Sequence, residues 1–518
     1  MPDVSAEPLV ALVGAGPGNP GLLTVRAVEC LARADLVLYD YLVPVQLLDY
    51  APETARRVCV NELADHHPER IPHVHALMID AARQGLRVVR LKGGDPLLFG
   101  RGGEEGQVLH AAGISFEIVP GVTAALGAAA YAGIPLTHRL HSSAVAIVTG
   151  HETPDRAQPN VDWAALARFP GTLVVYMGLA RLPWIAKTLI DHGLDPETPA
   201  AAVHAATTGS QHTVTAPLRD LPDAVKRAGL QAPTLLVIGS VVALRSDLAW
   251  FERRPLFGKR VLVTRPRHQA ADLVRRLEVL GANVVLMPAL EVRALTDWSA
   301  VDRAVGRLAT YQWLVFTSAN GVHAFVRRLH HLGRDLRALG TLQIAAIGPA
   351  TADTLRTYHL EPDLVPPEYR SESLAAALKE RVQGQRVLLA RADRGRDILR
   401  EELTAVADVE QIAVYSQVDA AAVDLCEVLR GGPLDYVTLT SSNSARALLG
   451  RLDAATQASI RGGALRLVSI SPVTSAALKE LNLPVAAEAA AYTSDGVVAA
   501  LVALAQAEAS AKEQAGNG

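Results

Sequence analysis

The sequence predicts an α/β protein whose strands pair into mostly parallel sheets and whose helices cover both faces of each sheet. Short β-branched runs, such as residues 87–91, 172–176 and 386–389, alternate with Ala/Leu/Arg-rich stretches of helical pattern. Strands that alternate with helices form parallel sheets between two layers of helices. The 518 residues are enough for about three domains of roughly 150 residues each.

A domain boundary is predicted near residue 255. Residues 9–13 and 260–264 are each predicted to form a strand that ends in a turn. The polar, proline-containing stretch 252–259 precedes the second of these strands. Stretches of this kind are typical of linkers between domains. The final residues, 506–518, are rich in Ala, Glu, Gln and Gly, and they are expected to form a disordered tail.

Composition excludes several classes of protein. Half of the residues are hydrophobic, and the net charge is −3, which argues against disorder and against nucleic-acid binding. Cys30, Cys59 and Cys426 lie far apart, so neither a disulfide framework nor a zinc site is expected. No signal peptide is evident, and the apolar stretch 124–136 is too short to span a membrane. A cytoplasmic location is therefore expected.

A glycine-rich loop follows the first strand. Residues 16–21 read Gly-Pro-Gly-Asn-Pro-Gly, which matches GxGxxG, and Asp40 ends the next strand about twenty residues later. This is the pattern of a dinucleotide-binding loop, in which free amides hold a pyrophosphate. Because Pro17 and Pro20 have no amide hydrogen, a structural turn with another role is favoured, and a nicotinamide or flavin site stays the alternative.

Two further strand ends carry residues suited to a ligand. One strand runs into Gly93, Gly94 and Asp95, where the backbone can approach a ligand closely. The carboxylate can accept from hydroxyl or ammonium groups, although capping a turn is the simpler role. Val119 ends another strand, and Thr123 is placed to cap the Ala-rich helix that follows.

Seven motifs in the first half together resemble uroporphyrinogen-III C-methyltransferase, of the two-lobed tetrapyrrole methylase class. They occur in order between about residues 8 and 245. They are GAGPGNPGLLT (14–24), YD (39–40), RLKGGDPLLFGRGGEE (90–105), VPGVTAA (119–125), PLTHR (135–139), TGH (149–151) and YMG (176–178). The resemblance implies transfer of methyl groups from S-adenosylmethionine to two ring carbons of uroporphyrinogen III, giving precorrin-2.

The resemblance also implies where the cofactor and a catalytic acid lie. The class holds S-adenosylmethionine between its lobes, and a sulfonium cation is tolerated beside backbone carbonyls and a carboxylate. Asp40 matches the acid proposed as proton acceptor, because methylation of a pyrrole carbon must end with loss of a proton. Met177 is alternatively a core residue. The implied cofactor-binding positions are Pro17, Gly93, Gly94, Asp95, Leu98, Thr123, Ala124, Met177 and Ala206.

One segment departs from the family pattern. Where the family usually reads VGKR, residues 60–63 read Val-Asn-Glu-Leu, so Glu62 replaces a lysine proposed as proton donor. The sequence diverges through residue 75, and its four histidines (His66, His67, His73 and His75) have no diagnostic metal-ligand spacing. A solvated loop is expected here, and a methylase half that is inactive or regulatory stays an alternative.

The second half repeats a pattern of hydroxyls and amides at strand ends. Residues 316–321 resemble 439–444, and residues 347–351 resemble 470–474. Helices that begin at Ser/Thr caps present free amides to carboxylates. Two similar α/β lobes are therefore predicted to line a shared cleft with these loops, although each loop alone is an ordinary helix cap.

These motifs are similar to uroporphyrinogen-III synthase over about residues 256–504. They are TRP (264–266), TSANGV (317–322), IGPATA (347–352), YRSESL (369–374), RADRGRDIL (391–399), VY (414–415), LTSSNSA (439–445) and SISPVTSAAL (469–478). The resemblance implies cyclisation of hydroxymethylbilane with inversion of the last ring, achieved by orientation of the substrate and without a cofactor.

The resemblance also implies two lobes in this half, one of residues 258–290 with 418–504 and the other of residues 292–416. Tyr415 matches the tyrosine suspected of helping the hydroxyl leave, as a phenol donor. A packed tyrosine with a satisfied hydroxyl is the alternative. The implied substrate-binding residues are Arg265, Thr317, Ser318, Asn320, Gly348, Ser371, Arg391, Ser441, Ser442, Asn443, Ser471 and Thr474.

The two implied reactions are consecutive, since the product of the second half is the substrate of the first. The chain is therefore predicted to be bifunctional, with a methyltransferase domain at residues 8–250 and a synthase domain at residues 256–505. A homodimer through the methylase half is expected, with tetrapyrrole substrates and neither nucleic acid nor membrane as partner. The alternatives are a synthase with a silent methylase half, a regulatory ligand sensor and a nicotinamide oxidoreductase. Cobalamin and sirohaem both stay open as the end product.

Overall fold

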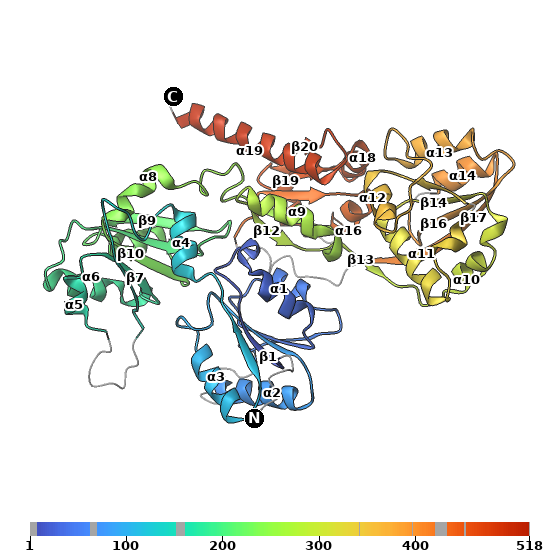
Figure 1. The fold of residues 1–518 in the computed structure, drawn as a ribbon. Helices are drawn as coiled ribbons and strands as arrows, with labels where there is room; N and C mark the ends of the chain where they lie inside the picture. Colours follow the sequence, from blue (N-terminus) through green and yellow to red (C-terminus); the bar gives the residue numbers. More distant parts are fainter. Residues whose placement is uncertain are drawn as a thin grey trace. The chain divides into compact units, whose positions relative to one another are not determined.

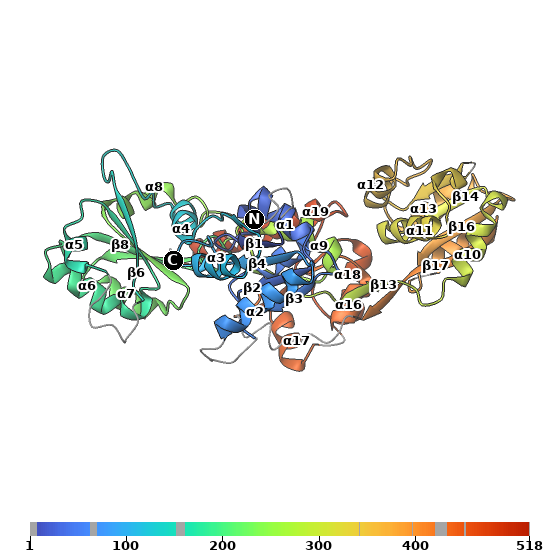
Figure 2. The same ribbon diagram turned by 60° about the horizontal axis from the view of Figure 1, so that its bottom comes forward.

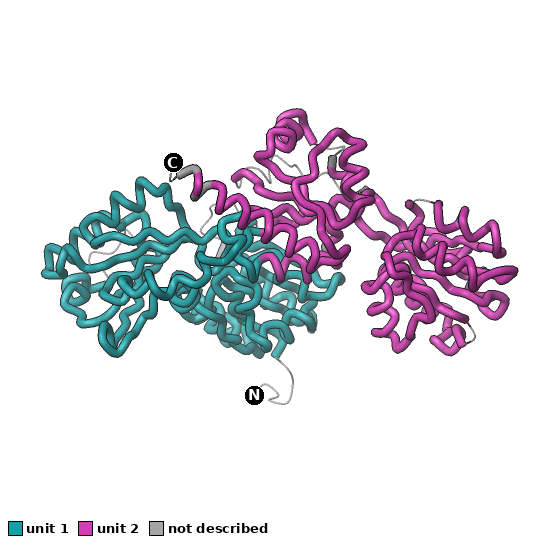
Figure 3. Tube along the Cα trace, turned by 90° about the horizontal axis from the view of Figure 1, so that it is seen from above, with its two compact units in different colours: residues 1–259, 278–283 teal, residues 260–277, 284–518 magenta. Residues whose placement is uncertain are grey.

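The computed structural model (Figure 1, Figure 2) describes residues 8–62, 70–151, 161–340, 342–395, 397–419, 432–449 and 452–516. The chain divides into two compact units, which Figure 3 shows in different colours. The N-terminal unit comprises Met1–Lys259 with Glu278–Asn283, and the C-terminal unit comprises Arg260–Leu277 with Val284–Gly518. Within the described residues, each unit is built around two five-stranded sheets.

The first sheet of the N-terminal unit is parallel throughout, with strand order β3-β2-β4-β1-β5. Val13 and Leu91 pack with α1 on one face, whereas Leu12 and Val88 pack with α2 on the other. Burial on both faces explains the continuous apolar run of β1. The elements are β1 (Val10–Gly14), η1 (Pro20–Leu22), α1 (Val25–Ala32), β2 (Leu36–Tyr39), η2 (Val45–Tyr50), β3 (Arg56–Cys59), α2 (Arg70–Arg83), β4 (Val88–Lys92), α3 (Gly102–Ala111) and β5 (Phe116–Val119).

The second sheet of this unit, with order β6-β7-β10-β8-β9, is mixed. Its strands are β6 (Val145–Thr149), β7 (Thr172–Tyr176), β8 (Pro199–His204), β9 (His212–Pro217) and β10 (Thr234–Ile238). β6 and β7 are parallel, but β7–β10, β10–β8 and β8–β9 are antiparallel. The connection 205–211 is too short for the crossover that a parallel pair needs. The expected parallel pattern therefore holds for only one of the four strand pairs in this sheet.

Helices cover both faces of this mixed sheet. Ile185 and Leu189 of α6 belong to the cluster on one face, with residues of α5 and α7, and Figure 2 shows these three helices along the sheet. On the other face, α4 packs through Ala125, Ala128 and Ala132, whose small side chains allow a close approach. The helical elements are α4 (Ala124–Ala132), α5 (Trp163–Ala167), η3 (Leu179–Arg181), α6 (Leu182–Asp191), α7 (Leu221–Ala228), η4 (Ser240–Leu244) and α8 (Arg245–Leu248).

The C-terminal unit contains one sheet of order β12-β11-β18-β19-β20. The pairs β11–β18, β18–β19 and β19–β20 are parallel. Leu262, Val437 and Leu467 contribute to its core. The elements are β11 (Arg260–Val263), α9 (Arg267–Val279), β12 (Asn283–Leu286), β18 (Tyr436–Leu439), α16 (Ser442–Leu449), α17 (Ala454–Arg461), β19 (Arg466–Ser469), α18 (Pro472–Glu480), β20 (Ala487–Glu488) and α19 (Ser494–Gly516).

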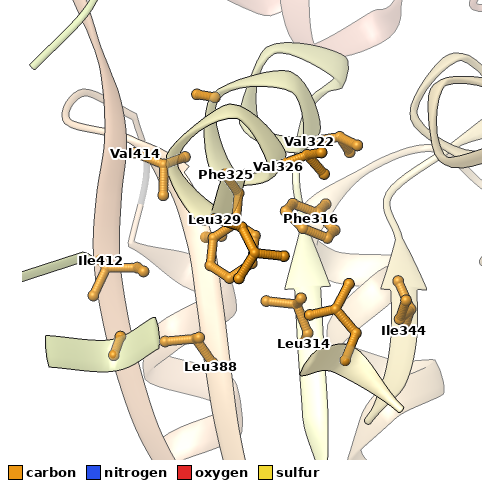
Figure 4. Packing of buried hydrophobic residues seen from close by; sticks show 14 of the residues in the cluster. Leu314, Phe316, Val322, Phe325, Val326, Leu329, Ile344, Leu388, Ile412 and Val414 are labelled. Carbon is orange, nitrogen blue, oxygen red and sulfur yellow. The ribbon is translucent and has the colours of Figure 1, made fainter. Parts of the chain in front are cut away.

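The other sheet of this unit has order β13-β17-β16-β14-β15, and all its pairs except β13–β17 are parallel. Figure 4 shows Phe325 and Leu329 of α11 packed over Leu314 and Phe316 of β14. The elements are β13 (Leu290–Arg293), α10 (Ser299–Gly306), η5 (Leu308–Thr310), β14 (Trp313–Phe316), α11 (Ala319–His331), η6 (Leu336–Leu339), β15 (Gln343–Ala346), α12 (Pro349–Thr357), α13 (Ser371–Lys379), β16 (Arg386–Ala392), α14 (Ile398–Thr404) and β17 (Asp408–Asp419).

The expectation of a disordered tail after residue 505 is wrong for the residues that the structure describes. Helix α19 continues to Gly516. Glu508 accepts a hydrogen bond from the Tyr436 hydroxyl at 2.8 Å and pairs with Arg466 at 2.8 Å, which ties this stretch to β18 and β19. Alanine has the highest helix propensity, so the same composition supports a helix once one face is anchored.

The predicted fold class, α/β with mostly parallel sheets, is confirmed across the two units. Helices pack against both faces of the sheets, as the alternation of strands and helices indicates. No helix in the described part of the chain combines the length and apolar character needed to cross a bilayer.

Candidate active sites

The carboxyl ends of the first parallel sheet bring several loops into contact. A Cβ atom on Gly14 would lie 2.5 Å from Gly121 Cα, and one on Gly121 would clash with the carbonyl oxygen of Gly94. A Cβ on Gly94 would lie 3.8 Å from the amide nitrogen of Ala124. The loops after β1, β4 and β5 therefore touch through their backbones, and only glycine fits at Gly14 and Gly121.

The loop at residues 16–21 has few amides left for a ligand. The amides of Gly16, Asn19 and Gly21 donate to oxygen atoms of the protein at 3.2, 3.0 and 2.7 Å. Pro17 and Pro20 have no amide hydrogen. The α-helix that follows, α1, begins only at Val25, after the loop has ended. These contacts favour the structural turn over a dinucleotide-binding loop.

Asp95 ties two of the loops together. Its Oδ1 accepts from the Leu97 amide at 2.8 Å, and its Oδ2 accepts from the Gly121 amide at 3.1 Å. The carboxylate therefore caps its own turn and also holds the loop after β5. Gly93 is exposed and Leu98 partly exposed beside it, so this turn borders the solvent.

Tyr176, at the end of β7, reaches the start of α4. Its hydroxyl lies 2.5 Å from Thr123 Oγ1 and accepts from the Ala125 amide at 2.7 Å. Thr123 is the N-cap residue of α4, but its hydroxyl bonds Tyr176 in place of a helix amide. Met177 follows with φ of 52° and is 52% exposed, so it is not a core residue. Left-handed backbone at a bulky residue is typical of functional sites.

The turn after β8 meets the first loop. The backbone amide of Asn19 donates to Thr207 Oγ1 in this turn. A Cβ on Gly18 would lie 3.2 Å from the carbonyl oxygen of Ala206. Pro17 packs against α4, where a Cβ on Gly127 would lie 2.5 Å from Pro17 Cγ. The nine predicted cofactor-binding residues therefore lie on loops or helix starts that these contacts link together.

A buried arginine holds Asp40 at the end of β2. Arg90 Nη2 donates to Asp40 Oδ1 at 2.6 Å, and Arg90 Nε donates to Glu105 Oε1 at 3.0 Å. Lys92 Nζ donates to the same Glu105 oxygen at 3.0 Å. Asp40 is 29% exposed, whereas the other three side chains are at most 7% exposed. We call these four residues the Asp40 network. Sequence reasoning missed three of them, although all three lie within the motif at residues 90–105.

Burial shapes the charges of the Asp40 network. Burial by itself lowers the pKa of Arg90, but the charges of Asp40 and Glu105 and the hydrogen bonds to them raise that pKa overall. Burial, with the charge of Arg90, lowers the pKa of Lys92 below its ordinary value. The pKa of His75 on α2 is also lowered, chiefly by burial. Buried charges persist only when they are paired, so Glu105 balances two cations.

Glu62 lies at the same edge of the sheet as Asp40. It follows β3, which pairs with β2, and its side chain is exposed. Residues 63–69 of the diverged segment, including His66 and His67, lie outside the described residues. Residues 70–75 form the start of α2, so the expected solvated loop is wrong for that stretch. In the part of the chain that the structure describes, no group of three or more His, Cys, Asp or Glu residues is arranged to hold a metal ion.

In the C-terminal unit, four predicted residues share one edge of a sheet. Ser318 follows β14, Gly348 follows β15, Arg391 lies near the end of β16, and Tyr415 lies on β17. These strands are adjacent and parallel, so their carboxyl ends meet. Arg391 is only 7% exposed and donates to Asp397 Oδ1 at 3.3 Å.

Helices begin directly at this edge. Ser318 is the N-cap of α11, and its Oγ accepts from the Gly321 amide at 3.0 Å. Gly348 is the N-cap of α12, and the ring of Tyr369 covers it. Ser371 is the first residue of α13. Thr317 and Asn320, on either side of the first cap, are partly exposed.

A β-bulge decides where Tyr415 points. Successive residues of β16 pair with Ala413 and then with Tyr415, so Val414 is an extra residue in β17. Val414 and Tyr415 consequently lie in the same core cluster, whereas neighbours in a regular strand face opposite sides. Tyr415 is 4% exposed, and its hydroxyl lies 3.0 Å from Ser318 Oγ. Burial raises the pKa of this phenol.

The other sheet of the unit places three predicted residues at its carboxyl edge. Arg265, Ser441 and Ser471 follow β11, β18 and β19, which are adjacent and parallel. Arg265 Nη1 donates to Ser494 Oγ at 2.9 Å, and burial lowers the pKa of this guanidinium.

Two serines at this edge act as helix caps. Ser441 Oγ accepts a hydrogen bond from the Ser444 amide at 3.0 Å. Ser442 and Asn443, in the first turn of α16, are partly exposed. Ser471 Oγ accepts from the Thr474 amide at 3.4 Å. Thr474 is only 1% exposed, so it lies behind the cap and not at the surface of the edge.

Two family models match the two halves of the chain. Residues 9–222 match the model described as Tetrapyrrole (Corrin/Porphyrin) Methylases, and residues 271–499 match Uroporphyrinogen-III synthase HemD. The porphyrin biosynthesis protein HemD of Ruminiclostridium josui is 34% identical over 481 residues, which cover 92% of this chain and 94% of that protein. The chain belongs to this HemD family of porphyrin biosynthesis proteins.

Other relatives match only part of this HemD-family chain. The uroporphyrinogen-III C-methyltransferase of Bacillus subtilis is 37% identical over 331 residues, covering 64% of this chain and 68% of that protein. The siroheme synthase of Methylococcus capsulatus is 51% identical over 245 residues, covering 47% of this chain and 52% of that protein. The chain therefore spans about half the length of that siroheme synthase.

Both resemblances that the sequence motifs indicated are confirmed. The chain is an enzyme of tetrapyrrole biosynthesis that joins a methylase domain to a uroporphyrinogen-III synthase domain. The roles of individual residues at the two sites stay predictions.

Proposed function

We propose that the chain catalyses two consecutive reactions. The C-terminal unit cyclises hydroxymethylbilane to uroporphyrinogen III with inversion of one ring, and the N-terminal unit methylates that product from S-adenosylmethionine to precorrin-2. The observation that carries the proposal is the placement of the two reactive groups. Asp40 and Tyr415 each lie at the carboxyl edge of a parallel sheet, among residues that match the motifs of the corresponding family.

The methylase loops suit a sulfonium compound better than a phosphorylated one. Of the four amides at residues 16–21, those of Gly16, Asn19 and Gly21 already donate to protein oxygens, so they are not free to cradle an anion. The Asp95 carboxylate and the exposed backbone at Gly93 tolerate a cation. Pro17, Thr123 and Met177 would border the bound molecule with the other predicted positions. When bound, S-adenosylmethionine supplies a methyl group carried on a positively charged sulfur.

Asp40 is proposed to accept the proton that the tetrapyrrole must lose once one of its ring carbons has been methylated. A carboxylate used in this way must be ionised, accessible and oriented. Asp40 is partly exposed while one of its oxygens is held by Arg90, so the side chain can meet a substrate without losing its orientation.

The synthase edges suit a flexible ligand with many carboxylates. Helices that begin at Ser318, Gly348 and Ser471 present amides at sheet edges, and we propose that the two lobes use them in a shared cleft. If the protein holds the linear substrate folded, ring closure with inversion becomes faster than the uncatalysed closure without inversion. Tyr415 would donate its phenolic proton to the leaving hydroxyl, and its raised pKa keeps that proton in place.

A synthase with a silent methylase half is the second candidate, and Glu62 favours it. This exposed carboxylate follows the strand next to the one that ends at Asp40. It repels a substrate that carries many carboxylates, and it replaces the lysine of the family pattern. Restoring the cation in a Glu62→Lys variant should increase methylation if this charge limits the reaction.

An anaerobic assay with hydroxymethylbilane tests both activities at once. The assay is run with and without S-adenosylmethionine, and it resolves tetrapyrrole isomers and their methylation state. Type III uroporphyrinogen followed by precorrin-2 is the expected result. Type III product that stays unmethylated in both the unaltered chain and Glu62→Lys would support the second candidate. Type I product alone would contradict the synthase assignment.

The chain is further proposed to form a homodimer through its methylase half, as the family resemblance implies. Sedimentation of the full chain tests this proposal, since a dimer has twice the mass of 54.9 kDa expected for one chain. A monomer at all concentrations used in the assay would contradict it.

A further inference from the structure

Arg90 is fixed by the protein through most of its donors. Its Nη1 lies 3.4 and 3.3 Å from the carbonyl oxygens of Leu38 and Leu91, on strands β2 and β4. Its Nε donates to Glu105, which leaves Nη2 for Asp40. A guanidinium held at Nε and Nη1 has one orientation, and the carboxylate bonded to Nη2 inherits it.

Glu105 anchors this arrangement from α3. Its Oε1 accepts from both Arg90 and Lys92, whereas its Oε2 is buried and has no hydrogen-bond partner among the described residues. A buried carboxylate with an unsatisfied oxygen is costly, and structures keep such groups where the charge is needed. Here the charge neutralises two buried cations that would otherwise repel each other.

Asp40 is the member of the network that meets the solvent. Its Oδ1 is occupied by Arg90, and within the described residues no hydrogen bond to its Oδ2 is present. The network therefore leaves one particular carboxylate oxygen available at the edge of the sheet where the predicted cofactor loops gather.

We propose that Arg90 and Glu105 are positioning residues that hold Asp40 oriented for proton transfer in the methylase reaction. This inference rests on the proposed methylation and on the proposed role of Asp40 in it. Methyl transfer to the ring carbon leaves the tetrapyrrole positively charged. A neighbouring C–H bond then gives its proton to Asp40 Oδ2, and the electrons of that bond restore the neutral π system. The step needs no other reactant.

Other charged groups face the same region as Asp40. They are Lys92 on β4, His75 on α2, Arg101 before α3 and Glu62 after β3. All four stay unchanged in the variants below. A difference between variants therefore reports the contact between Arg90 and Asp40.

The test compares methylation by the full chain and by its Arg90→Met and Glu105→Gln variants, with supplied uroporphyrinogen III. Arg90→Met should lower kcat by about tenfold or more, while the KM for S-adenosylmethionine stays within about twofold. Glu105→Gln should act in the same direction and more weakly.

Arg87→Met is the matched control. Arg87 precedes β4 at the opposite end from Lys92, and it pairs with Asp35 at 3.3 Å with a side chain that is 51% exposed. The Arg87→Met substitution should leave kcat for methylation unchanged. Affinity for S-adenosylhomocysteine, measured by calorimetry, reports whether the N-terminal unit of each variant is folded. If Arg90→Met loses that affinity, Arg90→Lys takes its place, with an intermediate kcat expected.

A double variant separates positioning from general stabilisation. In an Asp40→Asn background, Arg90→Met should lower kcat no further, because it acts through Asp40. An equal loss of kcat in both backgrounds would overturn the inference. A different result, in which the unaltered chain binds S-adenosylhomocysteine but forms no methylated product, would contradict the proposed function itself.

Discussion

The methylase edge and the synthase edges place different chemistry at the same position in similar sheets. The methylase edge encloses Arg90, Lys92 and Glu105 almost completely and leaves Asp40 partly exposed. The synthase edges instead carry hydroxyl groups at helix caps, together with the buried phenol of Tyr415. A single proton-transfer group needs a rigid charged support, whereas a reaction controlled by substrate folding needs many donors spread over a surface.

The two kinds of edge also differ in how their loops are held. The methylase loops touch through glycine backbones and shared hydrogen bonds, so a change in one loop reaches the others. Each synthase loop instead caps the helix that follows it, as Ser318 and Ser471 do. Substitutions should therefore have wider effects at the methylase edge than at the synthase edges.

The largest effect is expected for Asp40→Asn. Removing a general base should lower kcat for methylation by about 10²- to 10⁴-fold, with cyclisation of hydroxymethylbilane by the same chain unchanged. The anaerobic assay measures both rates in one sample. Asp35→Asn, in a surface pair with Arg87, is the control. Methylation that survives in Asp40→Asn would remove the proposed role of this carboxylate.

A smaller effect is expected for Tyr415→Phe, which removes only a hydroxyl. The synthase kcat should fall by about a hundredfold, the lower end for a general acid, while methylation of supplied uroporphyrinogen III continues. Tyr436→Phe is the matched control, because that tyrosine is also buried and hydrogen-bonded, to Glu508 at 2.8 Å. An unchanged proportion of type III product in Tyr415→Phe would favour the purely structural role.

Gly127→Ala tests how tightly the methylase loops are coupled. The added Cβ would lie 2.5 Å from Pro17 Cγ, so the first loop must shift. Overpacking of about 1–3 kcal/mol corresponds to roughly 5- to 100-fold loss of affinity for S-adenosylhomocysteine, measured by calorimetry. Gly103→Ala is the control, since its Cβ would meet nothing within 4 Å. Equal affinities in the two variants would mean that the loops move independently.

The smallest effect is expected for the synthase rate as the pH rises. Burial disfavours the phenolate of Tyr415 and raises its pKa, so the donor form persists beyond the ordinary tyrosine pKa of about 10. Initial rates, corrected for spontaneous cyclisation, should show no loss from this group between neutral pH and about pH 10. An alkaline limb well below that value, absent in Tyr415→Phe, would show that the phenol ionises earlier.

Sequence reasoning predicted much of the fold and part of each site. The alternation of β-branched runs with helical stretches predicted the α/β class, because each pattern reflects local burial on a strand or helix. The caps at Ser318, Ser441 and Ser471 follow from a hydroxyl directly before a helix. Composition failed at residues 506–516, where Ala-rich sequence fits either a tail or a helix and the contacts of Glu508 decide.

The sequence by itself determined which residues stand at the ends of strands, because strand and turn signals depend on near neighbours in the chain. Only the tertiary structure decided which of those residues touch. Arg90 reaches Asp40 because β4 pairs with β2, and Glu105 closes the network from a helix. Tyr415 reaches Ser318 because one extra residue in β17 turns its side chain to the other face. Strand pairing and register depend on packing across the whole sheet, and no local pattern contains that information.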